Sequence, residues 1–336
     1  MTLTVLEPEG LYPDTVLEQR IMGPSVRILR GACRSSLAEL PDELCAEADA
    51  LMTLRMAVPA EQIARFPKLR VILRMGVGYD RVDRAAAAAR GIKVCNVPDY
   101  GTQEVAEFAV LMALALRRGL TLYHDTQRGP APARWGVLPH PAVRRQEGQT
   151  FGILGLGRIG TAAALRARAF GWRVAFFDPF LPNGADRALG VARCRTLEEL
   201  LGEADVLSIH CPLTRRTRNL IGERELRLLP QNAIVVNTAR GPILDIEALE
   251  RALRDGHIAG AGLDVLPVEP PVEPIPSLLR AYRDREDWLA GRLIVTPHIA
   301  FHTPEAWDDI RLKSAETMRD VLVEGLNTNV IPPDSD

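Results

Sequence analysis

Short runs of Val, Ile and Leu alternate with amphipathic stretches along the N-terminal part of the chain. The amphipathic stretches have the three-to-four-residue spacing of helices that cover one face of a sheet. The apolar runs have the composition of buried parallel strands and fall at residues 2–8, 26–32, 49–54, 69–75 and 92–97. Because each crossover helix must cover one face of the sheet, this order predicts a five-stranded parallel, flavodoxin-like α/β unit that ends near Pro98.

The alternation stops at residues 99–101, where we expect a hinge. Thr102 is a candidate N-cap for the most apolar stretch, a helix that runs to Arg117–Arg118, with Gly119 as its stop. That stretch is well short of the roughly 20 apolar residues that span a bilayer. Residues 120–149 are polar, contain four prolines and lack a clear period, which predicts a loop or an arm exchanged with a second copy.

A second strand–helix rhythm follows. Its strands are expected at 150–156, 173–178, 205–211, 233–239, 258–265 and 293–298. Thr196 with Glu199 forms a candidate capping box, and Thr303-Pro304 opens a last helix that runs to Gly325. We therefore predict a Rossmann-fold domain at residues 102–299, inserted in the smaller flavodoxin-like domain formed by residues 1–101 plus 300–336.

Composition and charge narrow the classes of partner. The 336 residues carry a formal net charge of −2, which leaves no positive field to gather nucleic acid or anionic lipid, so neither is an expected partner. The five cysteines show no metal-binding or disulfide pattern. The N-terminus has neither a basic nor an apolar leader region. We expect reduced thiols and a cytoplasmic protein.

A glycine-rich turn lies between an expected strand and a helix. Gly155-Leu156-Gly157-Arg158-Ile159-Gly160 has the GxGxxG spacing, in which the first glycine permits the tight turn, the second lets the backbone approach a pyrophosphate, and the third allows close helix packing. Asp178 ends the next strand, where a carboxylate accepts hydrogen bonds from ribose hydroxyls and repels a 2′-phosphate. The pattern predicts a dinucleotide site that favours NAD over NADP.

Polar residues stand at the ends of five of the expected strands. In open parallel sheets, ligands bind at the carboxyl ends of the strands, so these residues mark a crevice for a nicotinamide and a charged substrate. They are Asp178, His210, Arg240, Asp264 and His298. Because each candidate ligand is a single residue on its own strand, no metal site is expected.

An ordered series of motifs carries a resemblance over nearly the whole chain. The segments at 74–83, 96–107, 155–160, 176–182, 210–214, 237–245, 262–270 and 296–301 resemble the D-isomer-specific 2-hydroxyacid dehydrogenases. Within that family, ALRARAFGWRVAFFDPFL and DRALG resemble the C-terminal-binding-protein branch, including its bacterial members. The resemblance implies an NAD-dependent oxidoreductase that acts on the CH–OH group of 2-hydroxy acids.

The resemblance also implies a catalytic triad of Arg240, Glu269 and His298. A forked guanidinium can hold a carboxylate and polarise a ketone, and an imidazolium can give a proton to the forming alkoxide. Glu269 would hydrogen-bond the other ring nitrogen and stabilise the charged ring. By sequence alone, Glu269 is an acid in a proline-rich loop, and only the family match assigns it a role.

Further residues carry over from the family one by one. Backbone N–H groups of Met75, Gly76, Val77 and Gly78 would hold the substrate carboxylate, with Arg74 nearby, and Asp264 would accept the nicotinamide carboxamide. The cofactor would be lined by Val77, His210, Cys211, Pro212, Thr217, Thr238 and Ala239. Apart from the family, Phe301 lies three residues past His298 and is therefore expected to line the substrate side-chain pocket, where an aromatic ring favours an apolar 2-oxo acid over glyoxylate.

Two other functions stay open at this point. One is an NAD(H)-sensing, dimeric, corepressor-like module that binds other proteins, and the other is a phosphite or phosphonate oxidoreductase. For the dehydrogenase, a homodimer through the nucleotide domain and the 120–149 arm is expected. Residues 270–292 form a longer segment than most metabolic members of the family carry, and their role is open.

Overall fold

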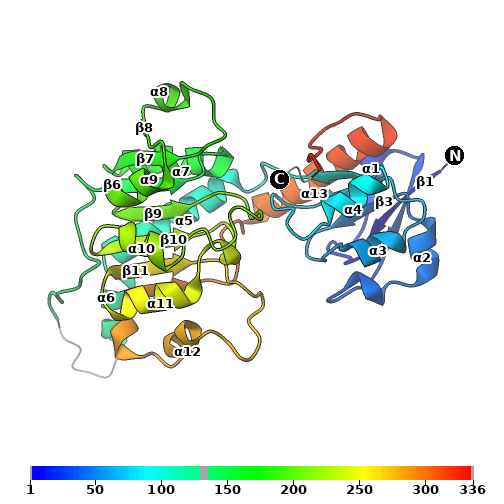
Figure 1. Ribbon diagram of the computed structural model, residues 1–336. Coiled ribbons are helices and arrows are strands. Elements are labelled where there is room, and N and C mark those ends of the chain that lie inside the picture. The colour runs from blue at the N-terminus through cyan, green and yellow to red at the C-terminus, as the bar shows by residue number, and fades with distance from the viewer. Residues whose placement is uncertain (1, 129–134, 334–336) are drawn as a thin grey trace. The chain divides into compact units, whose positions relative to one another are not determined.

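The computed structural model describes residues 2–128 and 135–333, which divide into two compact units. Unit 1 combines the chain up to Tyr100 with the chain from Thr303 onward, and unit 2 is Gly101–His302. In Figure 1 the blue N-terminal and red C-terminal segments accordingly belong to the same unit. The chain passes between the units twice, at 100–101 and at 302–303.

Unit 1 is built on a five-stranded parallel sheet, as the sequence predicts. The strands are β1 (Leu3–Glu7), β2 (Val26–Arg30), β3 (Ala50–Thr53), β4 (Val71–Arg74) and β5 (Lys93–Asn96). Their order is β2-β1-β3-β4-β5, the flavodoxin-like order, and every neighbouring pair is parallel. The helices are α1 (Val16–Met22), α2 (Asp42–Glu47), α3 (Ala60–Ala64), α4 (Arg84–Ala89), α13 (Pro304–Met318) and the short η1 (Leu37–Glu39).

The last helix returns the chain to unit 1. Thr303 caps α13 by accepting a hydrogen bond from the Ala306 N–H at 3.0 Å, and Pro304 is the first helical residue, as predicted. The helix continues into a π-helical turn, η4 (Arg319–Val323). Beyond it, Val330 forms an antiparallel bridge with Cys95 of β5, a pairing that the sequence analysis did not foresee.

Unit 2 is a parallel sheet with the Rossmann strand order. The strands are β6 (Thr150–Leu154), β7 (Arg173–Phe177), β8 (Ala192–Arg193), β9 (Val206–Ile209), β10 (Ala233–Asn237), β11 (Ile258–Leu263) and β12 (Leu293–Val295). The order is β12-β11-β10-β9-β6-β7-β8. It reverses direction between β6 and β9, which is the topological switch point where dinucleotides bind. Only the two-residue edge strand β8 was not predicted.

Helices cover both faces of this sheet, so its central strands are buried on both sides. Alternate residues of β10 enter different cores: Val235 packs with α9–α12, whereas Ile234 and Val236 pack with α5 and α7. The helices are α5 (Thr102–Arg117), α6 (Leu120–Arg128), α7 (Arg158–Ala169), α8 (Ala185–Leu189), α9 (Leu197–Glu203), α10 (Glu223–Leu228), α11 (Ile246–Arg254) and α12 (Ser277–Arg283), with the short η2 (Gly241–Ile243) and η3 (Asp287–Leu289). Because the central strands are buried on both faces, they form continuous apolar runs in the sequence.

Three local predictions need correction. Gly101, not Thr102, is the N-cap of α5, and Thr102 is its first helical residue. The segment after Gly119 begins with the helix α6 rather than a loop, and Leu122 of this helix packs against Gly291, where a Cβ would lie only 2.5 Å from the Leu122 Cβ. Residues 129–134 of the predicted arm lie outside the described part.

The predicted capping box of α9 is half formed. Thr196 caps α9 by accepting from the Glu199 N–H, but the Glu199 carboxylate accepts a hydrogen bond from the Arg195 N–H rather than from the Thr196 N–H.

Candidate active site

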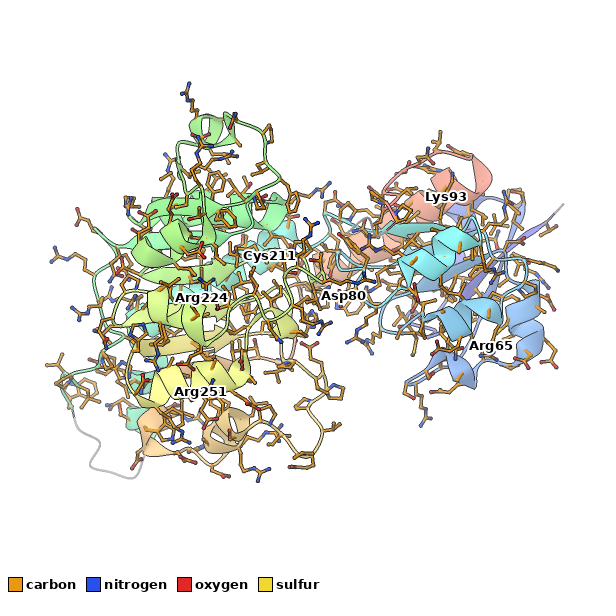
Figure 2. All side chains as sticks on the ribbon, viewed as in Figure 1. Arg65, Asp80, Lys93, Cys211, Arg224 and Arg251 are labelled. Atoms are coloured by element: carbon orange, nitrogen blue, oxygen red, sulfur yellow. The ribbon has the colours of Figure 1, made fainter. Side chains whose placement is uncertain are left out.

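The loops that follow the strands of unit 2 share one edge of its sheet. Because all seven strands are parallel, their carboxyl ends point the same way, and the polar strand-end residues predicted from the sequence fall on this edge. Two of these loops flank the switch point. One is the glycine turn after β6, and the other, after β9, carries Cys211, which is labelled in Figure 2.

The three glycines of the turn each meet a different steric demand. Gly155 has φ +92°, and a Cβ there would lie 2.8 Å from the Cys211 backbone nitrogen. A Cβ on Gly160 would lie 2.2 Å from the Gly155 carbonyl oxygen, so only glycine allows α7 to pack this close. Around Gly157, at the N-cap of α7, no described atom outside the adjoining backbone lies within 4 Å of such a Cβ. That open space lies at the positive end of a helix, where a pyrophosphate binds.

Asp178 lies directly after β7, beside this turn. Its carboxylate accepts hydrogen bonds from the Leu156 N–H (3.0 Å) and the Phe180 N–H (3.0 Å), one at each oxygen. A carboxylate has about four acceptor positions, so both oxygens keep capacity for ribose hydroxyls. The backbone bonds fix the direction in which those positions point.

Two half-buried side chains on the neighbouring loop are electrically neutral. Burial lowers the pKa of His210 to about 4, so its imidazole is uncharged near neutral pH. The Ser208 hydroxyl lies 2.8 Å from His210 Nε2 and fixes the ring. Burial likewise raises the pKa of the Cys211 thiol to about 12, which makes it a packing group rather than a nucleophile.

Asn237, the last residue of β10, shapes the turn that carries Arg240. Its side-chain amide donates to the Arg240 carbonyl (2.9 Å), and its carbonyl accepts from the Ala239 N–H (3.0 Å). The Arg240 Nη1 donates to the Ala239 carbonyl at 2.7 Å. The hydroxyl of Thr238 is buried and has no hydrogen-bond partner among the described residues. This turn therefore presents a cation and a buried hydroxyl at the sheet edge.

Glu269 and His298 form a pair although they follow different strands. His298 Nδ1 lies 2.7 Å from Glu269 Oε2. The other oxygen, Oε1, accepts from the Leu266 N–H at 2.8 Å. Burial by itself raises the pKa of Glu269, but the hydrogen bond and charge of His298, the Leu266 N–H and the charge of Arg240 outweigh it, so the net shift is downward. Glu269 is ionised at neutral pH, and Nε2 of His298 is the ring nitrogen left for a substrate.

In unit 1, the loop after β4 is partly engaged by its own neighbours. The N–H of Met75 donates to the Thr53 carbonyl and that of Gly76 to the Arg74 carbonyl. The Asn96 side chain donates to the Val77 carbonyl at 2.8 Å. The Arg74 guanidinium lies against Gly76, where a Cβ would be 2.4 Å from Nη1. Among the N–H groups that were predicted to hold an anion, those of Val77 and Gly78 donate no backbone hydrogen bond within the described residues.

Two other predicted residues have clear local surroundings. The Thr217 hydroxyl donates to the Pro212 carbonyl at 2.6 Å and so closes the turn after β9. Phe301 packs beside Gly101, where a Cβ would lie 3.2 Å from the Phe301 Cβ, next to the point where the chain passes between the units.

Sequence reasoning missed three residues that shape this edge: Ser208, Asn237 and Thr296. The exposed fractions of Ser208 and Asn237 are 0% and 1%, and Thr296 donates to Asp264 at 2.6 Å. A polar residue inside an otherwise apolar strand run is the available signal, because a buried polar group needs a partner. The identity of the partner cannot be read from that signal.

The residues of unit 2 fit a dinucleotide. The open space at Gly157, the free acceptor positions of Asp178 and the orphaned Thr238 hydroxyl all lie at the switch-point edge of a Rossmann sheet. In the described chain, no group of three or more His, Cys, Asp or Glu side chains is arranged to hold a metal ion. None of the described helices combines the length and apolarity needed to cross a bilayer. The fold and site thus define a dinucleotide-binding α/β protein.

Comparison with known proteins gives the family. Residues 110–300 match the model of the D-isomer specific 2-hydroxyacid dehydrogenase NAD binding domain. The chain is 37% identical over 291 residues to a glyoxylate reductase of Korarchaeum cryptofilum (strain OPF8), covering 85% of this chain and 82% of the relative. It is 40% identical over 273 residues to a glyoxylate reductase of Thermococcus gammatolerans, covering 79% and 78%. The chain therefore belongs to the D-isomer-specific 2-hydroxyacid dehydrogenase family.

A solved structure agrees with this assignment. The crystal structure of a glyoxylate reductase from Paecilomyes thermophila aligns with a TM-score of 0.84 and 27% identity, covering 98% of each chain. The predicted fold class, the NAD cofactor and an oxidoreductase acting on CH–OH groups are confirmed. The more detailed resemblance to the C-terminal-binding-protein branch stays a prediction.

Proposed function

We propose that this chain is an NAD-dependent D-2-hydroxyacid dehydrogenase that reduces 2-oxo acids with the triad Arg240, Glu269 and His298. The observation that carries the proposal is the 2.7 Å contact between His298 and Glu269 at the sheet edge that also holds the glycine turn. An imidazole paired with an ionised carboxylate is a general acid held in one orientation.

Each member of the triad has one task. Arg240 holds the substrate carboxylate and polarises the keto oxygen, and its turn is fixed by Asn237. NADH, when bound, supplies the hydride to the keto carbon. His298 donates the Nε2 proton to the oxygen as negative charge develops there, and Glu269 stabilises the imidazolium before the transfer. In the reverse direction, the neutral ring accepts the hydroxyl proton.

The cofactor is assigned to residues at the switch-point edge. The N-terminus of α7 and Gly157 would hold the pyrophosphate, Asp178 the adenosine ribose, and the orphaned Thr238 hydroxyl a polar atom of the dinucleotide. A carboxylate at the ribose favours NAD over NADP. The remaining proposed cofactor residues, several of them carried over from the family, are Val77, Gly155, Arg158, Ile159, Gly160, His210, Cys211, Pro212, Thr217, Ala239 and Asp264.

Unit 1 is proposed as the substrate-binding domain and unit 2 as the NAD-binding domain. In unit 1 the N–H groups of Val77 and Gly78 are the candidates for holding the substrate carboxylate, because those of Met75 and Gly76 are engaged. Arg74 adds a positive charge at the same loop. Phe301 is the candidate wall for the substrate side chain.

Glyoxylate is the first acid to test, because two of the relatives that this chain resembles are named glyoxylate reductases. The Phe301 ring instead favours an apolar acid: each buried methylene contributes about 0.8 kcal/mol, so a four-carbon tail could raise kcat/KM by up to roughly two orders of magnitude. Initial rates of NADH oxidation with glyoxylate, 2-oxoisocaproate, phenylpyruvate and 2-oxoglutarate separate these substrates. No turnover of any 2-oxo acid would refute the proposed reaction.

The catalytic assignment is tested with His298→Ala and the best acid of that panel. Loss of a general acid lowers kcat by roughly two to four orders of magnitude, whereas the affinity for NADH should stay within a few fold. His257→Ala is a matched control, because that histidine lies after α11 and bonds Leu226 and Gln231 on a different part of unit 2. Activity of His298→Ala within a few fold of the wild type would remove His298 from the mechanism.

We also infer a homodimer in the cytoplasm. Leu111 on α5 and Leu165 on α7 are 54% and 49% exposed, and Phe170, just after α7, is 56% exposed. Helices α5 and α7 pack against each other, and exposed apolar side chains on such a helix pair are typical of an interface with a second copy. Light scattering of Leu165→Glu against the wild type tests it, and an unchanged monomer mass for both would contradict it. The five free thiols support a reducing compartment.

A further inference from the structure

The buried side chain of Asp264 bonds the loop that carries His298 at several points. Asp264 directly follows β11 and is 1% exposed. Its Oδ1 accepts hydrogen bonds from the Thr296 hydroxyl (2.6 Å) and the Ile299 N–H (2.9 Å), and its Oδ2 accepts from the Ala300 N–H (2.9 Å). Its backbone carbonyl accepts from the His298 N–H at 2.8 Å. A single residue thus bonds the loop on both sides of the histidine and at the histidine itself.

The backbone of His298 needs such support. Its φ is +57°, in the left-handed region that only a few per cent of non-glycine residues occupy. A residue in this region persists only where its surroundings fix it more strongly than the strain opposes it. The bonds from Thr296, Ile299 and Ala300 to one carboxylate provide that constraint, because all three must break together for the loop to relax.

We propose that Asp264 and Thr296 are positioning residues for His298. They hold the loop in the left-handed conformation that brings Nδ1 onto Glu269 and leaves Nε2 for the substrate. This inference rests on the proposed function: it adds Thr296 and gives Asp264 a second role, and neither residue touches the reacting atoms.

The role is compatible with the cofactor contact implied by the family resemblance. A carboxylate has about four acceptor positions, and the loop takes three of them. The remaining position, on Oδ2, can accept from a nicotinamide carboxamide. Asp264 would then link cofactor and acid: the group that orients the nicotinamide would also fix the loop that delivers the proton.

The kinetic consequence follows from geometry. General acid catalysis needs a hydrogen-bond distance of about 2.6–3.2 Å, and a misplacement of about 1 Å can cost on the order of a hundredfold in rate. Loosening the loop should therefore lower kcat much more than it weakens binding of either NADH or the 2-oxo acid.

The test uses Thr296→Val, which removes the hydroxyl and nearly keeps the shape, and Thr296→Ser, which keeps the hydroxyl. For Thr296→Val we expect kcat to fall about tenfold, with KM for the acid and Kd for NADH within about threefold. Thr296→Ser should restore at least half of the lost rate. Thr317→Val is the matched control: Thr317 is a 2% exposed threonine of α13 whose hydroxyl accepts from Asn329, and its loss should leave kcat unchanged.

A readout without turnover completes the test. In protein labelled with ¹⁵N at histidine, the signal of the His298 Nδ1 proton, assigned by its absence in His298→Ala, reports the bond to Glu269. We expect this signal to shift or broaden in Thr296→Val, to return in Thr296→Ser and to be unaffected in Thr317→Val. If the wild type reduced no 2-oxo acid, the proposed function would fail while this signal still decided the positioning role.

Asp264→Asn provides a second variant in case the valine variant is poorly folded. The amide nitrogen would face either the Ala300 N–H or the Thr296 and Ile299 donors, so at least one bond is replaced by a repulsive pair. The expected fall in kcat is about a hundredfold. An unchanged His298 signal together with kcat within twofold of the wild type, in both Thr296→Val and Asp264→Asn, would overturn the proposal. Equal losses of kcat in Thr296→Val and Thr296→Ser would do so as well.

Discussion

Glu7 makes the stability of unit 1 depend on pH, and replacing it by Gln should remove that dependence. Glu7 ends β1, is 4% exposed, and neither carboxylate oxygen has a hydrogen-bond partner among the described residues. Its pKa is raised from 4.5 to about 7. Burial is the largest cause and the charges of Glu18 on α1 and of Glu9 add to it, whereas those of Arg30 on β2 and Arg311 on α13 act against it.

The sign of the effect follows from proton linkage. Between pH 4.5 and 7 the folded state binds this proton more tightly than the unfolded state, so folding is favoured at low pH. This stability is fully present below about pH 4.5 and is lost as the pH rises through 7. A shift from 4.5 to about 7, at about 1.36 kcal/mol per unit, corresponds to about 3 kcal/mol at pH 8 and above.

The glutamine variant keeps the shape and is neutral at every pH. At pH 8 we expect Glu7→Gln to stabilise unit 1 by up to about 3 kcal/mol, and at pH 5 to change its stability by less than about 1 kcal/mol. For a unit of this size the gain corresponds to a rise in Tm on the order of 10 °C. The variant should therefore be the more stable protein only in neutral and alkaline buffer.

Urea unfolding followed by pulse proteolysis measures this free energy if the cleaved peptides are identified by mass spectrometry. Peptides from β1 and α13 report unit 1, and peptides from β6 and β10 report unit 2 as an internal reference. Glu61→Gln, at an exposed position of α3, is the control and should follow the wild type at every pH. Parallel curves of stability against pH for the wild type and Glu7→Gln between pH 5 and 8 would refute the reasoning.

Two further predictions concern the chemistry. Because of Asp178, the wild type should bind NADH at least tenfold more tightly than NADPH, a difference of about 1.4 kcal/mol, in fluorescence titrations. Asp178→Ser should narrow that ratio of affinities. Equal affinities of the wild type for both cofactors would contradict the assignment of Asp178 to the ribose. Glu269→Gln removes the charge that favours the imidazolium, so the pH at which 2-oxo acid reduction declines should move to lower values, and a pH–rate profile identical to that of the wild type would exclude the pairing as a catalytic feature.

Local sequence patterns determined much of this protein without its tertiary structure. The spacing of Gly155, Gly157 and Gly160 already assigned a steric task to each glycine, because those tasks depend on a few bonds of backbone around one turn. The strands could be placed because burial on both faces leaves continuous apolar runs. The rule that ligands bind at the carboxyl ends of parallel strands then located Arg240, Asp264 and His298 on one edge.

Only the tertiary structure decided which side chains meet. The family resemblance implied that Glu269 and His298 pair, but no local period brings two residues 29 positions apart into contact, because the contact depends on the path of the intervening chain. The same holds for the bond of Thr296 to Asp264, 32 residues away, and for the packing of α6 on Gly291. Backbone periodicity acts over a few residues, whereas a hydrogen bond between side chains requires two distant loops to end within about 3 Å of each other, and only the packed fold sets that distance.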